Sequence, residues 1–351
     1  MIRQCLLAAA AAALAATAFA ADVPPSKEGT WIARDVRFHT GETLPEVKLA
    51  YRTLGDPRNE AILVLHGTGG SSGTMLTPAF AGELFGPGQP LDATRYFIVV
   101  PDAVGHGKSS KPSDGLRMKF PRYDYDDVVA LHHRLLTEGL GVKHLRMVIG
   151  NSMGGMETWL YAEKHPEFMD IAVPMACLPI PMGSRNWMTR RLIIDSIRND
   201  PAWKNGEYTE QPNGARFGTA FYQVAMSGGN FGWYKQAPTR QKADEVLDAR
   251  LKAPFTADAN DVLYQWESSG DFDPSADLEK IRATVLAINA ADDERNPVEL
   301  GLLEREMKRV KNGRILLIPA GPETTGHGTT ASAKWYRDAL AELLKSAPRG
   351  S

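Results

Sequence analysis

The chain has 351 residues, of which 43% are hydrophobic and 23% charged, values typical of a globular protein. Its formal net charge is -2 and it contains no long run of lysine and arginine, which argues against a nucleic-acid partner. The length allows one large α/β domain or two small ones, with an ample core in either case.

The first twenty residues have the composition of a secretory signal peptide. Arg3 precedes an apolar, alanine-rich stretch at 6–16, and Ala18-Phe19-Ala20 supplies the small residues that precede a cleavage site. The apolar stretch is shorter than the ~20 residues of a membrane-spanning helix. We therefore expect cleavage before Ala21, export to a periplasm or secretion, and no membrane span in the mature chain. Cys177 is then the only cysteine, so we expect neither an intramolecular disulfide nor a metal site.

The rest of the chain alternates apolar runs with segments of helical periodicity. Residues 31–38 and 47–54 alternate apolar and polar side chains, which predicts an antiparallel hairpin. Continuous apolar runs predict strands that are buried on both faces. These strands cover residues 61–65, 96–100, 145–149, 170–175, 284–289 and 315–318, and the predicted helices cover 125–138, 156–164 and 335–344. Such alternation predicts an α/β fold with a mostly parallel central sheet flanked by helices.

One predicted strand runs directly into Gly150-Asn151-Ser152-Met153-Gly154, a Gly-x-Ser-x-Gly sequence followed by a helix. This pattern predicts a nucleophile elbow, in which the glycines let backbones pass closely and the serine hydroxyl stands above the sheet. Ser152 is therefore the candidate nucleophile. The amide of Met153 is expected to donate to the oxyanion of a bound carbonyl.

A second oxyanion donor is expected in the loop after the first buried strand. His66-Gly67-Thr68-Gly69-Gly70 fits this role, because glycines let the loop turn its amides inward. We assign the Thr68 amide as the donor, with Gly69 as the alternative. His66 and Gly67, together with Asn151, are expected around the substrate.

A nucleophilic serine needs a base and an acid. His327 follows the last predicted strand, and Asp292-Asp293 follow the strand before it, which gives the order serine, acid, histidine. Asp293 is preferred as the acid because it lies four residues before Pro297, and Asp292 is the alternative. With these groups Ser152 would form an acyl-enzyme and release the acyl group to water or an alcohol, without a metal or redox cofactor.

Several stretches resemble the homoserine O-acetyltransferase family of α/β hydrolases. They are Gly86-Pro87-Gly88-Gln89-Pro90-Leu91-Asp92, the elbow from Gly150 to Glu157, Arg190-Arg191-Leu192-Ile193, Asp200-Pro201-Ala202-Trp203 and Gly326-His327. In that family a serine is acetylated by acetyl-CoA and passes the acetyl group to homoserine. The resemblance covers most of the mature chain and implies a triad of Ser152, Asp293 and His327.

The resemblance also implies the domain organisation. A hydrolase core in two parts, 21–180 and 276–351, is expected to carry a helical lid at 181–275. The family places a lid arginine near the substrate carboxylate, which makes Arg190 a candidate anion contact; the alternative is a solvent-exposed lid charge. A homodimer formed through lid helices is a further hypothesis.

Three features depart from that family and favour hydrolysis. The loops at 66–70 and 101–109 are closer to those of general hydrolases, and export would separate the protein from acetyl-CoA. We therefore expect an exported serine esterase that acts on a small ester or thioester. The alternative is an O-acyltransferase of the homoserine O-acetyltransferase type, and the lesser alternative is a non-catalytic binding protein on a hydrolase fold. Lid tryptophans and methionines are expected to pack the lid and to roof an apolar acyl pocket.

Overall fold

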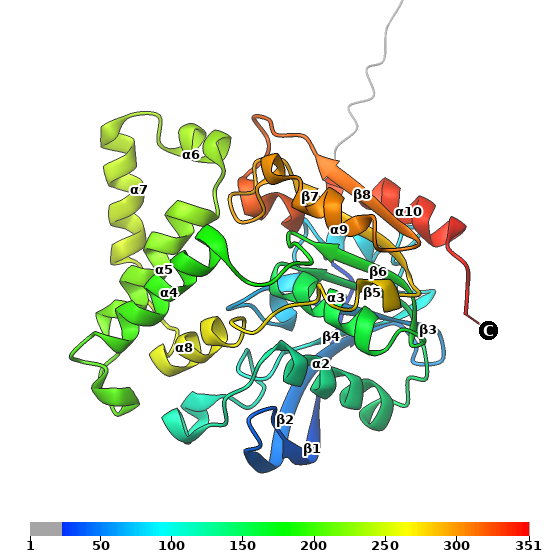
Figure 1. Ribbon diagram of the computed structural model, residues 1–351, viewed down its shortest axis with the longest axis horizontal. Coiled ribbons are helices and arrows are strands. Elements are labelled where there is room, and N and C mark those ends of the chain that lie inside the picture. The colour runs from blue at the N-terminus through cyan, green and yellow to red at the C-terminus, as the bar shows by residue number, and fades with distance from the viewer. Residues whose placement is uncertain (1–22, 351) are drawn as a thin grey trace, which may run out of the picture.

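The computed structural model describes residues 23–350, which form an eight-stranded sheet, helices on both of its faces and a group of helices beside it (Figure 1). The strand order is β1-β2-β4-β3-β5-β6-β7-β8. β1 and β2 form the predicted hairpin, β2 is antiparallel to β4, and all other neighbours are parallel. The strands are β1 Lys27–Arg37, β2 Thr43–Leu54, β3 Glu60–Leu65, β4 Tyr96–Pro101, β5 Leu145–Asn151, β6 Met169–Met175, β7 Thr284–Ala290 and β8 Gly313–Ile318.

The central parallel strands are short and apolar because both of their faces are covered. Every residue of β4 and of β6 is buried, whereas the edge strand β8 is partly exposed. The carboxyl ends of parallel strands meet at one edge of a sheet, where ligands bind in such folds. The loops that follow β3, β5, β7 and β8 therefore come together at that edge.

Helices cover the two faces of the sheet through separate apolar clusters. One cluster packs α2, α3 and α9 against the sheet, and the other packs α1 and α10 against its opposite face. These helices are α1 Ala81–Leu84, α2 Tyr125–Arg134, α3 Met153–Lys164, α9 Leu302–Met307 and α10 Arg337–Ser346. The prediction of a mostly parallel sheet flanked by helices is confirmed.

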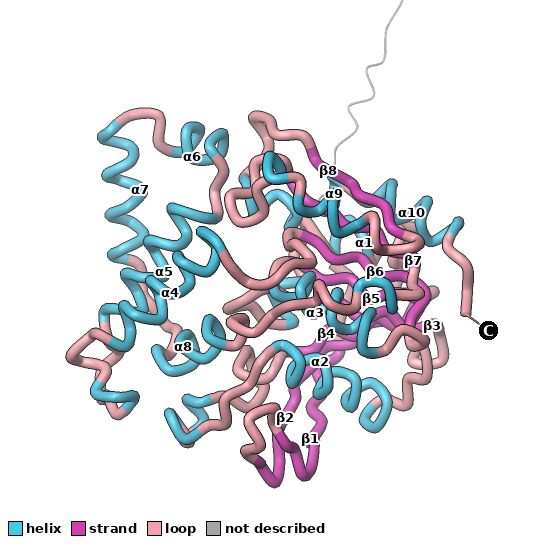
Figure 2. The backbone as a smooth tube through the Cα atoms, viewed as in Figure 1, coloured by secondary structure: helices cyan, strands magenta, loops and turns pink. Residues whose placement is uncertain are grey.

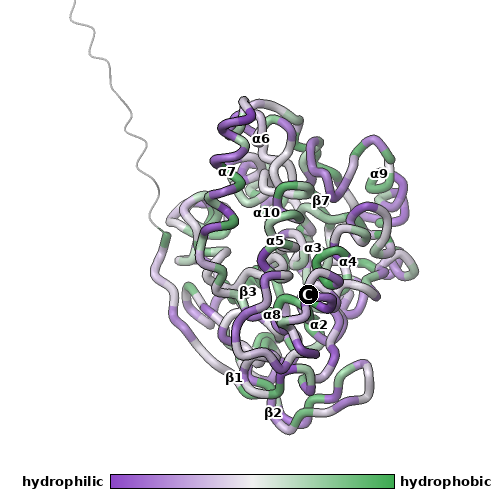
Figure 3. The backbone as a smooth tube through the Cα atoms, turned by 90° about the vertical axis from the view of Figure 1, so that its left-hand side faces the viewer, coloured by the Kyte–Doolittle hydropathy of each residue, from purple (hydrophilic) through white to green (hydrophobic). Residues whose placement is uncertain are grey.

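Five helices lie between β6 and β7, in the region 181–275 that we call the lid. They form a layer beside the strands, shown in cyan against magenta in Figure 2. The lid has an apolar cluster of its own, to which Ile193, Tyr222 and Trp266 belong. α7 contributes no buried residue and is largely hydrophilic in Figure 3. The lid helices are α4 Ser184–Arg198, α5 Asn213–Met226, α6 Asn230–Gln236, α7 Arg240–Lys252 and α8 Ala259–Glu267.

Some boundaries differ from the sequence-based expectation. α3 begins at Met153, three residues earlier than predicted, and the helix expected over 125–138 changes at Leu135 into a π-helical turn that ends at Gly139. The predicted signal peptide, 1–20, lies outside the described residues. Across residues 23–350, no helix has both the length and the apolar character needed to cross a membrane.

Candidate active site

Ser152 lies at the turn between β5 and α3 with backbone torsions of φ 59° and ψ -113°. A Cβ on Gly150 would overlap the backbone of Gly154, and a Cβ on Gly154 would overlap the carbonyl of Leu65 at the end of β3. The Ser152 amide donates to the carbonyl of Met175 at 2.9 Å, which fixes the turn. Both glycines are therefore required sterically, and the strained serine has the geometry of the predicted nucleophile elbow.

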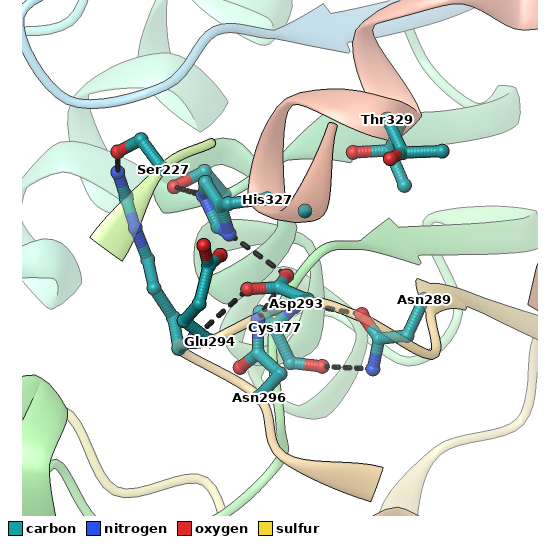
Figure 4. Close-up of polar contacts among 12 residues, drawn as sticks. Cys177, Ser227, Asn289, Asp293, Glu294, Asn296, His327 and Thr329 are labelled. Atoms are coloured by element: carbon teal, nitrogen blue, oxygen red, sulfur yellow. Dashed lines mark hydrogen bonds and ion pairs between the residues drawn. The ribbon is translucent and has the colours of Figure 1, made fainter. Parts of the chain in front are cut away.

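Ser152, His327 and Asp293 form one hydrogen-bonded chain. His327 Nε2 is 2.9 Å from Ser152 Oγ, and His327 Nδ1 is 2.8 Å from Asp293 Oδ2. Figure 4 shows the imidazole and the carboxylate joined in this way. The relative exposures of the three residues are 5%, 7% and 2%. This arrangement can move a proton from the hydroxyl to the imidazole while the carboxylate fixes the ring tautomer.

The two aspartates after β7 have different partners. Asp293 also accepts a hydrogen bond from the side-chain amide of Asn296 at 2.8 Å. Asp292 instead accepts one from Thr324 Oγ1 at 2.7 Å and one from the amide of Gly326 at 3.2 Å. The geometry therefore gives Asp293 the position of the acid and uses Asp292 to fix the histidine loop.

Burial and nearby charges set the protonation states of this chain of residues. Burial, and then the charge of Arg295, lower the pKa of His327, although Asp293 opposes this shift. Burial alone would raise the pKa of Asp293, but the charge and hydrogen bond of His327 hold it below its ordinary value. At neutral pH the imidazole is therefore neutral and can accept a proton, while the carboxylate is ionised.

Backbone amides lie next to the serine on two sides. Gly67, in the loop after β3, would bring a Cβ to 3.5 Å from the Ser152 Cβ, so the loop lies directly against the nucleophile. Within residues 23–350, the amides of Thr68 and Met153 donate to no other group, and the same holds for Gly69. Thr68 and Met153 can therefore act as oxyanion donors, with Gly69 retained as the alternative to Thr68.

Two residues expected around the substrate serve the protein framework instead. His66 is buried, with Nδ1 2.9 Å from the carbonyl of Gly67 and Nε2 accepting from the amide of Ala103 at 3.1 Å. Asn151 accepts a hydrogen bond from Thr330 Oγ1 at 2.6 Å. Both ring nitrogens of His66 are therefore in use within the protein. The Asn151 side chain holds the histidine loop against the elbow.

Arg190 is fully buried in the lid, so the alternative of a solvent-exposed charge is wrong. Its guanidinium donates to Asn186 Oδ1 and to Ser269 Oγ, both at 3.0 Å, and lies over the ring of Trp266 at 5.1 Å. In the described chain Nη2 has no partner. After the larger effect of burial, the charge of Arg190 helps to lower the pKa of His327. Arg190 therefore lies close to the site with one donor to spare.

Two further side chains at the site were not predicted. The Tyr125 hydroxyl, at the start of α2, lies beside Thr68 and Arg190; burial raises its pKa, and these two neighbours oppose the shift. Arg295 lies over the ring of Tyr222 at 4.6 Å. Arg295 could have been assigned to the site from the sequence, because it lies two residues after the acid. Tyr125 could not, because an aromatic residue at the start of an amphipathic helix usually belongs to the hydrophobic core.

A cavity of about 760 Å³ lies between the lid and the loop that carries Thr68. Two of the lid tryptophans, Trp233 and Trp266, line this cavity as expected, but polar and charged side chains are as prominent in its wall, so the pocket is less apolar than predicted. Trp203 and Met226 pack inside the lid, as was also expected. The rings in the wall are Tyr222, Trp233, Phe255 and Trp266, and the polar residues include Gln223, Arg250, Asp261 and Gln265.

One group of potential metal ligands gathers away from the elbow. His39, Asp124 and Asp127 bring ligand atoms within 4.8 Å of one another in the described part of the chain. His39 Nδ1 is 2.7 Å from Asp127 Oδ2, and Asp124 accepts from the Asp127 amide as the N-cap of α2. These hydrogen bonds give the group a structural role: the two aspartates cap α2, and Asp127 holds His39 in the β1–β2 turn.

Comparison with known proteins agrees with this architecture. Residues 60–212 match the sequence profile of the family described as alpha/beta hydrolase fold. Over 208 residues the chain is 32% identical to homoserine O-acetyltransferase from Thermobifida fusca (strain YX), covering 54% of this chain and 54% of that protein. The homoserine O-acetyltransferase structure from Bacillus anthracis superposes with a TM-score of 0.77 at 21% identity, covering 93% of this chain and 100% of that one. An acetylester hydrolase from Corynebacterium glutamicum gives a TM-score of 0.78 at 21% identity, covering 91% and 96%.

The sheet, the elbow and these matches show that the chain has the α/β-hydrolase fold, which its relatives use both for ester hydrolysis and for acyl transfer. Over the part of the chain that they match, the sequence relatives are homoserine O-acetyltransferases, at 32–34% identity. The chain spans about half the length of the Thermobifida relative that it matches.

Proposed function

We propose that this chain is an exported serine hydrolase that cleaves a small ester or thioester through Ser152, His327 and Asp293. The observation that carries the proposal is the hydrogen-bonded chain from Ser152 Oγ through both ring nitrogens of His327 to Asp293, at 2.9 and 2.8 Å. A purely binding role would not need a strained serine, a neutral buried imidazole and a buried carboxylate in line.

The proposed mechanism has two proton-balanced halves. Ser152 Oγ attacks the carbonyl carbon and gives its proton to His327 Nε2, while the amides of Met153 and Thr68 hold the oxyanion. Collapse breaks the bond to the leaving alcohol or thiol, which takes the proton from His327 and leaves acyl-Ser152. Water then attacks the acyl-enzyme, gives its proton to His327, and releases the acid as the proton returns to serine.

We propose that the substrate carries a negative charge. Arg190 and Arg295 lie near the site, and neither forms an ion pair with a carboxylate in the described chain. A buried guanidinium without a counter-charge is costly, so a substrate carboxylate would stabilise this arrangement. Arg190→Gln should lower kcat/KM for p-nitrophenyl hemisuccinate relative to p-nitrophenyl butyrate by about tenfold to hundredfold, the range of a charge-assisted hydrogen bond. An unchanged ratio would contradict the anion site.

Acyl transfer of the homoserine O-acetyltransferase type is the second candidate, favoured by the names of the sequence relatives. The cavity of about 760 Å³ beside Thr68 has room for an acyl group together with either water or an alcohol, so its size fits both reactions. The two reactions share the acyl-enzyme and differ only in whether water or an alcohol resolves it.

A partition assay separates these two candidates. The chain from residue 21 onward is given p-nitrophenyl acetate or acetyl-CoA, each with and without homoserine, and free acetate is quantified against O-acetyl product. We expect acetate that homoserine does not divert. O-acetylhomoserine formed from acetyl-CoA would instead establish the transferase, and a matched Ser152→Ala variant controls for uncatalysed acyl transfer.

We also propose that the chain forms a homodimer through the lid. α4 and α5 expose five large apolar side chains on their outer faces: Met188, Leu192, Phe217, Phe221 and Val224. The spacing of these residues makes one apolar stripe on each helix, and two copies related by a twofold axis could bury both stripes as four packed helices. Light scattering should find a dimer that F217S/F221S converts to a monomer; a monomer at micromolar concentration for the unmodified chain would end this proposal.

Export is proposed from the sequence of residues 1–20 alone. Expression of the full chain in a bacterium should yield a periplasmic or secreted protein whose first residue is Ala21. A full-length chain retained in the cytoplasm would contradict it.

A further inference from the structure

The turn between the lid helices α5 and α6, residues 227–229, lies against the loops of the candidate active site, and we call it the lid turn. Ser227 and Gly228 line the large cavity together with Thr325, which belongs to the loop that carries His327. The lid turn is therefore part of the wall that would face a substrate.

Two glycines bring the lid turn and the histidine loop into backbone contact. Gly229 of the lid turn has φ 64°, and Gly326, which directly precedes His327, has φ 56°. A Cβ on Gly229 would lie 2.5 Å from the nitrogen of Gly326, and a Cβ on Gly326 would lie 2.5 Å from the nitrogen of Gly229. Neither position has room for a side chain. The place of the lid turn therefore constrains the residue next to the proposed base.

Glu294, which follows Asp293, connects both glycines to the acid loop. Its Oε1 accepts a hydrogen bond from the amide of Gly229 at 2.5 Å, and its Oε2 occupies the space that a Cβ on Gly326 would need. The carbonyl of Glu294 also accepts from Nη2 of Arg185, on the lid helix α4, at 2.9 Å. Side chain and backbone of this one residue thus bind two parts of the lid.

Arg295 adds two hydrogen bonds to the same region of the lid. Its Nε donates to the carbonyl of Met226 at 2.8 Å, and its Nη2 donates to Ser227 Oγ (Figure 4). The two residues after Asp293 therefore hold the end of α5 and the lid turn through hydrogen bonds that involve charged groups, which are stronger than neutral ones.

We propose that Glu294 is a positioning residue for the base: by holding Gly229, it keeps the lid turn against the histidine loop. Loss of this hydrogen bond would release the backbone contact on one side of His327. The imidazole Nε2 lies 2.9 Å from Ser152 Oγ, and a small displacement of a base from such a position lowers the rate strongly. This role rests on the proposed reaction, whereas the contact itself can be measured without any reaction.

Rates per active site test the positioning role, with the amount of active protein taken from fluorophosphonate titration. Glu294→Ala removes the acceptor and should lower kcat for p-nitrophenyl acetate by at least about tenfold, the effect of losing one hydrogen bond to a charged group. Glu294→Gln keeps an oxygen that can accept from Gly229, so its kcat should stay within about threefold of the unmodified chain. Glu299→Ala changes an exposed carboxylate on the same loop and is the matched control, with unchanged kcat.

Gly229→Ala breaks the same contact from the lid side, because its Cβ would meet the nitrogen of Gly326. It should lower kcat by a factor similar to that of Glu294→Ala. The double variant should be no more than about twofold slower than the slower single variant, because both changes remove one contact. Losses that multiply would show that the two residues act independently and would overturn the inference.

Hydrogen exchange measures the contact directly. Amides of residues 227–236 should exchange at least about tenfold faster in Glu294→Ala than in Glu299→Ala. If the unmodified chain shows no esterase activity, the proposed function fails, and this comparison still decides whether Glu294 holds the lid turn. The inference is overturned if exchange is equal in the two variants, if an active Glu294→Ala keeps the kcat of Glu299→Ala, or if Glu294→Gln is as slow as Glu294→Ala.

Discussion

Replacing Asp293 with asparagine tests the assignment of the acid at a single atom. Asp293 Oδ2 accepts a hydrogen bond from His327 Nδ1 at 2.8 Å, which leaves Nε2 free to accept the proton of Ser152. An amide at this position can donate to Nδ1, which places the ring proton on Nε2 and removes the base. In a serine protease the same change lowers kcat about 10,000-fold, or ~5.5 kcal/mol at 1.36 kcal/mol per tenfold. We expect a loss of that order here.

The matched control is Asp292→Asn. Asp292 bonds to Thr324 and Gly326 and not to the imidazole, and an asparagine oxygen can still accept both bonds. The decrease in kcat caused by Asp292→Asn should stay below about tenfold. Both variants are assayed with p-nitrophenyl acetate after thermal unfolding has shown that they fold. A larger loss for Asp292→Asn than for Asp293→Asn would refute the assignment.

Three further predictions concern pH and packing. The acid limb of kcat/KM should have its midpoint below the ordinary histidine value of 6.5, because burial and a nearby arginine lower the pKa of His327; a midpoint above 7 would argue against this base. Burial raises the pKa of Glu157 well above its ordinary value of 4.5. The free energy of unfolding should therefore fall as the pH rises from 4.5 towards the raised pKa. Glu157→Gln should remove this pH dependence, so that in urea unfolding its free energy of unfolding gains about 1.4 kcal/mol per pH unit over that of the unmodified chain. A difference between the two proteins that stays constant across pH would show that the carboxyl is not buried as described. Gly154→Ala should cost about 3 kcal/mol or more in the same assay, because its Cβ overlaps the Leu65 carbonyl, and a well-folded variant would show that the elbow is looser.

The strands and the elbow could be predicted because their signals are local. A run such as residues 61–65 is continuous in sequence, and Gly150-x-Ser152-x-Gly154 places both required glycines beside the serine. The start of α3 was missed because Gly154 and Gly155 disfavour helix in isolation. In the fold their missing side chains let α3 pack against the backbones of β3 and β6, and this tertiary packing overrides the propensity.

The details of the site depended on contacts that the sequence does not encode locally. Asp292 and Asp293 follow the same strand, and only the turn decides which carboxylate meets the histidine. Arg190 and Arg191 are neighbours on one helix, and the burial of Arg190 follows from Trp266 and Ser269, which come much later in the lid. The polar character of the large cavity also arises from several segments. The signal peptide, the dimer and the lid boundaries remain predictions.

The central claim is that Ser152 is the nucleophile. The most direct test is to treat the purified protein with a fluorophosphonate and to measure its intact mass, with Ser152→Ala treated in parallel. We predict one adduct per chain, located on the peptide that contains Ser152, and none on the variant. Full labelling of Ser152→Ala would contradict the claim.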